Sequence, residues 1–110
     1  MKIEDKIVIA SEFSQTPGAR YREDGDFSGE QFLDELLLPK FTKAIENKYI
    51  LLIDLDKVWG YPSSFVSGSF GKLSIQYGAD VLLKHIEFKS EDNEFRLEKI
   101  IKEINKPLKK

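Results

Sequence analysis

Residues 50–71 read ILLIDLDKVWGYPSSFVSGSFG, and they decide the fold of this chain. The apolar residues at 49–55 do not alternate with polar ones, which predicts a strand buried on both faces of a sheet. A tight turn with Gly60 and Pro62 follows, and a segment of small residues and phenylalanines then predicts a helix. A strand, a tight loop and a helix in this order are typical of α/β proteins, in which ligands and modifications gather at the loop after the strand.

Similar patterns on both sides of this stretch continue the alternation of strands and helices. Further strands are predicted at residues 3–9 and 80–88, with a short edge strand at 19–23. Helices are predicted from Ser28 to the end of an apolar stripe at Ile45, from Ser63 or Ser64 to Gln76 or Tyr77, and from Ser90 or Asp92 to just before Pro107. We therefore expect one α/β domain over residues 1–110, with a mainly parallel sheet of about four strands and about three helices.

The first predicted helix begins with an N-cap motif and contains an interior proline. Ser28 followed by Gln31 fits a capping box, in which the serine hydroxyl accepts a hydrogen bond from an amide of the first turn. Pro39 lies inside the apolar stripe, and an interior proline removes one backbone hydrogen bond at a cost of about 3 kcal/mol. A kink or break is therefore expected near Leu38.

The composition narrows the classes of function. With 17 basic and 19 acidic residues the formal net charge is −2, whereas nucleic-acid-binding surfaces usually carry a basic excess. The absence of cysteine excludes disulfides, thiol catalysis and thiolate metal sites, and one histidine, His85, is too few for a histidine metal cluster. We expect no cofactor and no nucleic-acid partner.

The two ends of the sequence predict no contact with a membrane. The first ten residues, MKIEDKIVIA, contain acids and only a short apolar run, which does not fit a signal peptide. No run approaches the roughly 18 apolar residues that a membrane-spanning helix needs, so a cytoplasmic protein is the simplest interpretation. The C-terminal end is basic and is interpreted as a solvated helix end, because positive charges stabilise a helix C-terminus. Its lysines are Lys102, Lys106, Lys109 and Lys110.

Ser63 and Ser64 stand at the start of a predicted helix and admit two interpretations. One of them can be the N-cap, whose hydroxyl accepts from an amide one turn on. A hydroxyl at this position can also be a phosphorylation acceptor, since helix N-terminal amides would bind a phosphoryl group that adds about two negative charges. Capping explains one serine and leaves the second free, so both residues are candidate acceptors.

The helix after these serines has an unusual small-residue face. Its members recur at steps of three and four, and they are Ser64, Ser67, Gly68, Gly71 and Ile75. An interior glycine costs roughly 1 kcal/mol relative to alanine, so a close contact must offset it. Packing inside the protein is favoured for Gly71, whereas packing and contact with a partner both stay open for Gly68.

Aromatic residues near the serines predict a surface for a protein partner. Trp59 and Tyr61 are the residue types that dominate interface hot spots. The predicted partner-binding residues are Trp59, Tyr61, Phe65, Ser67 and Gly68.

Two other hypotheses remain at this point. Asp54 and Asp56 end the central strand and could hold magnesium or act as acid and base, although a structural pair of turn carboxylates is favoured. A small enzyme or ligand-binding domain would need these carboxylates to converge with Ser63 and His85, but no nucleophile-elbow motif is present, and we expect the chain not to be an enzyme. The third hypothesis is a structural assembly domain.

Several motifs, taken in order, resemble those of a known family. They lie in PGARYREDGDFSGEQF (17–32) and IDLDKVWGYPSSFVSGSFGKL (53–73), and they comprise Pro17, Gly18 and Arg20; Ser28, Gly29 and Glu30; Asp54 and Asp56; then Ser63, Ser64, Phe65, Phe70 and Gly71. In these motifs the chain resembles the bacterial STAS-like domain family of unknown function, which is related to the anti-sigma factor antagonists.

This resemblance implies a fold and a function. Anti-sigma factor antagonists have a small sheet with helices on one side and a phosphorylatable serine at a helix N-terminus. They read Asp-Ser-Ser-Gly where this chain reads Pro62-Ser63-Ser64-Phe65, so both serines match and the flanking residues do not. The resemblance implies a regulatory protein-binding module with Ser63 as first and Ser64 as second acceptor, and a serine kinase or anti-sigma-like ATPase of the histidine-kinase type as partner.

Overall fold

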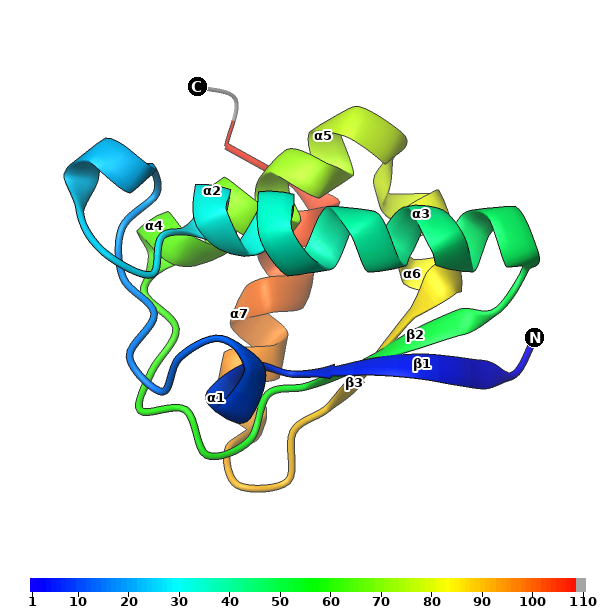
Figure 1. The fold of residues 1–110 in the computed structure, drawn as a ribbon, viewed down its shortest axis with the longest axis horizontal. Coiled ribbons are helices and arrows are strands. Elements are labelled where there is room, and N and C mark those ends of the chain that lie inside the picture. Colours follow the sequence, from blue (N-terminus) through cyan, green and yellow to red (C-terminus); the bar gives the residue numbers. More distant parts are fainter. Residues whose placement is uncertain (109–110) are drawn as a thin grey trace.

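The computed structural model describes residues 1–108 and is built on one parallel sheet (Figure 1). Its strands are β1 (Ile3–Val8), β2 (Ile50–Asp54) and β3 (Ile86–Lys89), which lie side by side in chain order. Both neighbours of the central strand β2 run parallel to it. The predicted α/β class and parallel sheet are confirmed, but the described residues form three strands rather than four.

The predicted edge strand at residues 19–23 is wrong. This segment lies in a loop that contains the 3-10 turn η1 (Arg22–Asp24). The carbonyls of Ala19 and Arg20 accept hydrogen bonds from Gly29 N at 2.8 Å and Glu30 N at 3.0 Å. The loop therefore binds the start of a helix through its backbone and does not extend the sheet.

The predicted strand at residues 80–88 is right only in its last three residues. Helix α6 (Ala79–His85) occupies the rest, and the chain becomes extended in β3. Gly78, with φ of 89°, turns the chain, and its carbonyl accepts from Leu82 N at 3.1 Å. A short apolar run fits a buried helical turn as well as a strand, so its pattern alone does not separate the two.

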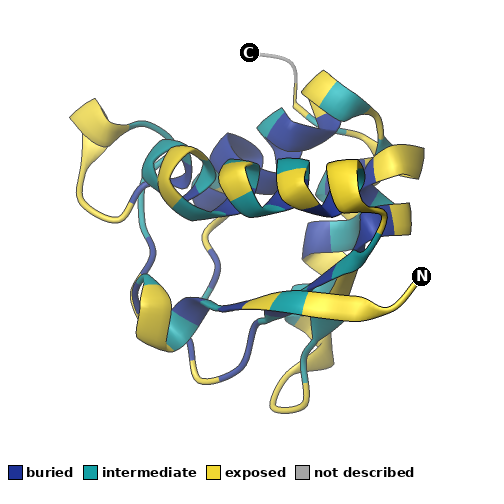
Figure 2. Ribbon diagram, turned by 45° about the vertical axis from the view of Figure 1, so that its right-hand side comes forward, coloured by how far each residue is buried: buried dark blue, intermediate teal, exposed yellow. Residues whose placement is uncertain are grey.

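The remaining helices form a layer over one face of the sheet (Figures 1 and 2). A short helix, α1 (Ile9–Glu12), directly follows β1. The layer contains α2 (Gly29–Phe32), the π-helical turn η2 (Leu33–Leu37), α3 (Leu38–Asn47), α4 (Ser63–Val66), the π-helical turn η3 (Ser67–Gly71) and α5 (Lys72–Tyr77). Helix α7 (Glu94–Asn105) runs from the loop after β3 up to this layer and packs against η3 (Figure 1). Within residues 1–108, no helix has the length and apolar character that crossing a membrane requires.

The helix ends largely follow their sequence signals. Ser28 is the N-cap of α2, and its Oγ accepts from Gln31 N at 3.0 Å. Asn93 caps α7, which ends before Pro107 as predicted. Lys102 lies in the last turn of α7, whereas Lys109 and Lys110 of the predicted basic end lie outside the described residues.

Pro39 does not break its helix. Leu38 N donates to Leu33 O, five residues back, which makes the turn before the proline π-helical. The hydrogen-bond ladder thus shifts by one residue where Pro39 has no amide hydrogen to donate. The expected break near Leu38 is therefore replaced by a π-helical turn inside a helix that continues to Asn47.

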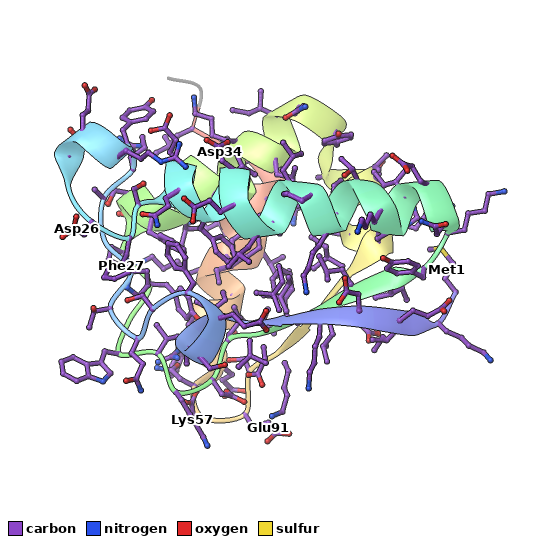
Figure 3. All side chains as sticks on the ribbon, in the orientation of Figure 1. Met1, Asp26, Phe27, Asp34, Lys57 and Glu91 are labelled. Atoms are coloured by element: carbon purple, nitrogen blue, oxygen red, sulfur yellow. The ribbon has the colours of Figure 1, made fainter. Side chains whose placement is uncertain are left out.

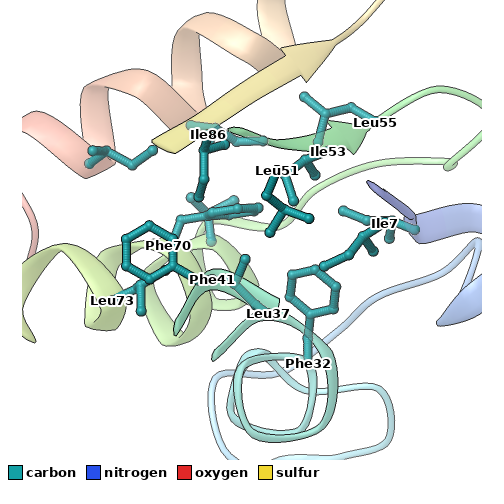
Figure 4. Packing of buried hydrophobic residues seen from close by; sticks show 14 of the residues in the cluster. Ile7, Phe32, Leu37, Phe41, Leu51, Ile53, Leu55, Phe70, Leu73 and Ile86 are labelled. Carbon is teal, nitrogen blue, oxygen red and sulfur yellow. The ribbon is translucent and has the colours of Figure 1, made fainter. Parts of the chain in front are cut away.

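The core lies between the sheet and the helical layer (Figure 4). Leu51 and Ile53 of the central strand are fully buried, and the rings of Phe32, Phe41 and Phe70 pack with them. Phe32 and Phe70 lie 5.9 Å apart between ring centroids. Each such side chain contributes roughly 1.5–3 kcal/mol when it leaves water, so the phenylalanines stabilise this layered arrangement.

Two glycines allow close backbone contacts: Gly29 between α2 and the helix that begins at Ser63, and Gly68 between that helix and the loop at 19–23. A Cβ on Gly29 would lie 2.5 Å from Phe65 O, and one on Gly68 would lie 2.6 Å from Arg20 O. Both atoms belong to the backbone, so neither can move aside cheaply. Gly68 therefore packs inside the protein, and its alternative role as a partner contact is wrong.

We predict that Gly68→Ala lowers the free energy of unfolding by about 1–3 kcal/mol, the usual range for overpacking. The added methyl group would meet the backbone of Arg20. Gly71→Ala is the matched control, because its Cβ would meet the flexible end of Glu103 at 2.8 Å. That side chain can move, and the change gains about 1 kcal/mol in helix propensity. Urea unfolding of the two variants measures the difference, and equal stabilities would contradict the close approach at Gly68.

Candidate functional site

Three hydrogen bonds from two other segments of the chain fix the loop between β2 and α4. Trp59 N donates to Gln15 O at 2.9 Å, and Gln15 Nε2 donates to Lys57 O at 3.1 Å. From α7, Lys99 Nζ donates to Tyr61 O at 2.7 Å. The backbone of this loop is therefore fixed, and its exposed side chains project from it into solvent.

Tyr61 fixes the same loop from inside. Its hydroxyl donates to Leu55 O at 2.8 Å, and Arg96 Nη1 donates to the same carbonyl at 3.0 Å. Burial raises the pKa of the Tyr61 phenol, while the guanidinium of Arg96, 5.4 Å from the ring centroid, acts in the opposite direction. The phenol thus stays a neutral hydrogen-bond donor at physiological pH.

Trp59 is the most exposed large apolar side chain of the described residues, at 81% of its full accessibility. It stands beside an open groove of about 440 Å³, which is lined by Thr16, Pro17, Trp59, Gly60, Tyr61, Pro62 and Lys99. Lys99 is the only lining residue with a positive charge. An exposed indole on a fixed loop, next to a groove, is a suitable anchor for a protein partner.

The two serines begin the helix after this groove, but neither caps it. Pro62 occupies the N-cap position, with φ −57° and ψ 146°, and its carbonyl accepts from Val66 N at 3.1 Å. No side chain caps the first amides of the helix. The predicted capping role is therefore wrong: Ser63 is an exposed first helical residue, and Ser64 is half-buried.

Four of the five predicted partner-binding residues lie inside the protein. Tyr61 and Ser67 are each 4% exposed, Phe65 is fully buried, and Gly68 is buried against the loop. Phe65 packs 5.5 Å from Phe32 between ring centroids. The predicted contact of Phe65, Ser67 and Gly68 with a partner is thus corrected to a supporting role beneath the surface. Tyr61 reaches the surface only as part of the groove lining, and of the five residues Trp59 alone is exposed.

We call the surface formed by Trp59, Gly60, Pro62, Ser63 and the groove beside them the serine corner. It joins an exposed aromatic side chain to an exposed hydroxyl within one short stretch of chain. The amides at the N-terminus of the following helix add a partial positive charge beside Ser63.

Asp54 and Asp56 tie two loops together at the carboxyl edge of the sheet. Asp54 Oδ1 accepts from Asp56 N at 3.0 Å, which closes the turn after β2. Asp56 Oδ1 accepts from Glu91 N at 2.7 Å and from Asp92 N at 3.1 Å, which holds the loop between β3 and α7. These bonds support the structural interpretation of the acidic pair.

Lys89 balances part of the negative charge at this edge. Its Nζ lies 3.6 Å from both Asp54 Oδ2 and Asp56 Oδ2, and the carboxylate of Asp54, followed by that of Glu91, raises the pKa of the lysine. An open cavity of about 660 Å³ lies here, and its lining includes Lys57 and Glu91. Figure 3 shows the side chains of these two residues on the same side of the molecule. Within residues 1–108, no three histidine or acidic side chains are placed to hold a metal ion.

The charge of Asp56 depends on its hydrogen bonds. Burial by itself would raise the pKa of this carboxyl, but the amides of Asp92 and Glu91 and the charge of Lys89 outweigh it, and the pKa is lowered from 3.8. The ionised form is thus the one that holds the two loops together.

His85 lies at the opposite edge of the sheet. Its Nδ1 is 3.1 Å from Tyr49 O, just before β2, whereas Asp54 is the last residue of that strand. A strand rises about 3.3 Å per residue, so Tyr49 and Asp54, at the two ends of β2, lie roughly 16 Å apart. His85 therefore does not converge with Asp54 and Asp56, and the site that would combine these residues with Ser63 is not formed.

Comparison with known proteins agrees with the resemblance found in the motifs. The family model described as STAS-like domain of unknown function (DUF4325) matches residues 28–96. The chain belongs to this STAS-like family. Its match covers Ser28 to α7 and includes both serines, while the motif at Pro17 lies before it. Neither the curated proteins nor the solved structures gave a match to the chain.

Several residues that build the site of this STAS-like domain carry no signal in the sequence. Gln15 and Lys99 hold the serine corner from 42 and 38 residues away along the chain, and Asp56 binds amides 35 and 36 residues away. Contacts of this range follow from the tertiary fold, and no local pattern of glutamine or lysine marks them.

We predict that Asp56→Asn lowers the free energy of unfolding at neutral pH by about 1–3 kcal/mol, the range for lost hydrogen bonds to a charged group. Because its folded pKa lies below the unfolded value of 3.8, wild-type Asp56 stabilises the fold above that pH and loses this effect as pH falls through the folded pKa. Urea unfolding at about pH 6 and about pH 3 should therefore show a smaller pH dependence in the variant.

Asp26→Asn is the matched control, since Asp26 is an exposed loop residue with the same carboxyl group. It should keep the wild-type pH dependence. An Asp56→Asn variant with an unchanged pH profile would show that this carboxylate does not hold the two loops.

Proposed function

We propose that this STAS-like domain is a regulatory protein-binding module that docks a partner protein over the serine corner. The main support is the exposure of Trp59, at 81%, on a loop whose backbone Gln15 and Lys99 hold through hydrogen bonds. An aromatic side chain that is fixed before binding loses little entropy when it docks, so such residues favour affinity. The proposal includes no catalytic step and no cofactor, and it assigns the module to the cytoplasm.

We further propose that phosphorylation of Ser63 switches this docking. Ser63 is exposed, and its position at the start of a helix is free of side-chain caps. A phosphoryl group there would receive hydrogen bonds from helix amides and would place about two negative charges beside Trp59. Added charge and bulk on this surface would release the partner. Ser64 is the second candidate, although it is half-buried.

The proposed partner is a serine kinase of the histidine-kinase-like ATPase type, as in the anti-sigma factor antagonists that the motifs resemble. The family match supports a STAS-like domain, and the paired serines support the position of the acceptor. A kinase that docks at the serine corner would reach Ser63 and contact Trp59 in one complex.

The test is phosphorylation by the purified histidine-kinase-like ATPase whose gene lies nearest to that of this chain. With ATP, we expect one phosphoryl group on the wild-type protein and on Ser64→Ala, and none on Ser63→Ala. Intact-mass measurement reads the result directly. A wild-type protein that takes up no phosphoryl group, or uptake that persists when both serines are replaced, would contradict the switch.

Docking is tested in the same assay with two exposed aromatic residues. Trp59→Ala should slow phosphorylation about tenfold or more, since hot-spot truncations cost about 2 kcal/mol or more. Phe95→Ala is the control, because Phe95 is 74% exposed but lies at the start of α7, outside the groove lining. Equal rates for the two variants would contradict docking over the serine corner.

A further inference from the structure

Within residues 1–108, one face of the parallel sheet carries no helix. The helices that pack on the sheet within residues 1–108 lie on the same side of it (Figures 1 and 2). Buried residues such as Ile7, Leu51 and Ile53 point to that side. All-parallel sheets are normally covered on both faces, so the second face of this sheet is suited to a cover from outside the chain.

The bare face has an apolar centre and a polar rim. Side chains alternate along each strand, so Ile50 and Leu52 of the central strand point to the face opposite Leu51 and Ile53. Both are half-buried, and Ile3 beside them is 46% exposed. A hollow of about 380 Å³ lies here, lined by Ile3, Glu4, Asp5, Lys6 and Leu52.

Opposite charges flank this apolar centre in one row. The register places Lys6 of β1 and Glu87 of β3 on the two sides of Leu52. Both charged residues are exposed, and within residues 1–108 neither forms an ion pair. The row therefore has a positive end, an apolar middle and a negative end.

We propose that the bare face binds a second copy of this chain, face to face, about a two-fold axis parallel to β2. This axis brings Leu52 against Leu52 of the second copy and Ile50 against its Ile50. It also sets Lys6 opposite Glu87 of the second copy, and the symmetry makes this ion pair twice. A two-fold axis across the strands would instead set Lys6 against Lys6, which like-charge repulsion disfavours.

The charges explain why the occupant is a second copy and not an unrelated helix. A row that runs from positive to negative across three strands is complementary to itself under this rotation. Asp54 also meets its own copy near the axis, but Lys89 lies 3.6 Å from each Asp54 carboxylate and offsets the repulsion. The apolar end at Ile50 therefore forms the tight part of the contact.

The size of the face sets the strength of the dimer. Three strands about 4.8 Å apart and about five residues long give a face of roughly 14 Å by 17 Å. This is well below the roughly 800 Å² per partner of a stable interface. The dimer is thus reversible, and its population rises with protein concentration.

Sedimentation velocity between about 10 µM and about 1 mM tests this proposal over the affinity range of weak complexes. The wild-type protein should shift from monomer toward dimer. Lys6→Glu and Glu87→Lys should each weaken association at least tenfold, because each sets like charges against one another in both symmetric contacts. The double variant Lys6→Glu/Glu87→Lys exchanges the charges and should restore association to within about threefold of wild type.

Lys43→Glu makes the same charge change as Lys6→Glu on exposed α3, in the helical layer, and should leave association unchanged. Circular dichroism and thermal unfolding of each variant confirm that the fold is retained. The proposal is overturned by a protein that stays monomeric up to about 1 mM, by single variants that associate like wild type, or by a double variant that does not recover.

Discussion

The structure depends on one cluster of close backbone contacts, in which the helices at Gly29 and Gly68 approach each other and the loop at Arg20. Gly29 N and Glu30 N bind the carbonyls of Ala19 and Arg20, and Gly68 leaves room for Arg20 O at a distance that excludes a side chain. These contacts join the helix that begins at α2, the helix that begins at α4, and the loop between α1 and α2. The same loop carries Gln15, whose backbone and side chain hold Trp59 and Lys57. The position of the serine corner therefore follows from two residues that lack a Cβ.

The central strand, the start of α2 and the end of α5 could be predicted because their signals are local. An unbroken apolar run predicts β2, and Ser28 followed by Gln31 predicts the N-cap of α2. Gly78 follows the last residue of α5, as expected for a residue that ends a helix. The apolar segment before β3 is ambiguous because a buried helical turn and a buried strand use the same residues over this length. The segment at 19–23 resembles a strand, but its carbonyls bind helix amides that a local pattern does not reveal.

The position of the candidate site could be predicted from the sequence, but which of its side chains are exposed could not. Strand, turn and paired serines locate the corner, and the exposure of Trp59 and Ser63 agrees with that position. Which aromatic and small residues face outward depends on the packing of η3 against α2 and the loop, and this buries Phe65, Ser67 and Gly68. Asp54 and Asp56 lie at the expected strand end, where a local hydrogen bond at Asp54 and long-range hydrogen bonds at Asp56 give them a structural role.

The central claim is that the backbone contact at Gly29 holds the loop and, through it, the serine corner. Native-state hydrogen exchange followed by NMR tests it most directly. We expect the amides of Gly29 and Glu30 to exchange only through global unfolding, with opening free energies equal to the stability of the domain. Exchange of these two amides at rates typical of an unstructured loop, while the core strand β2 stays protected, would contradict the account.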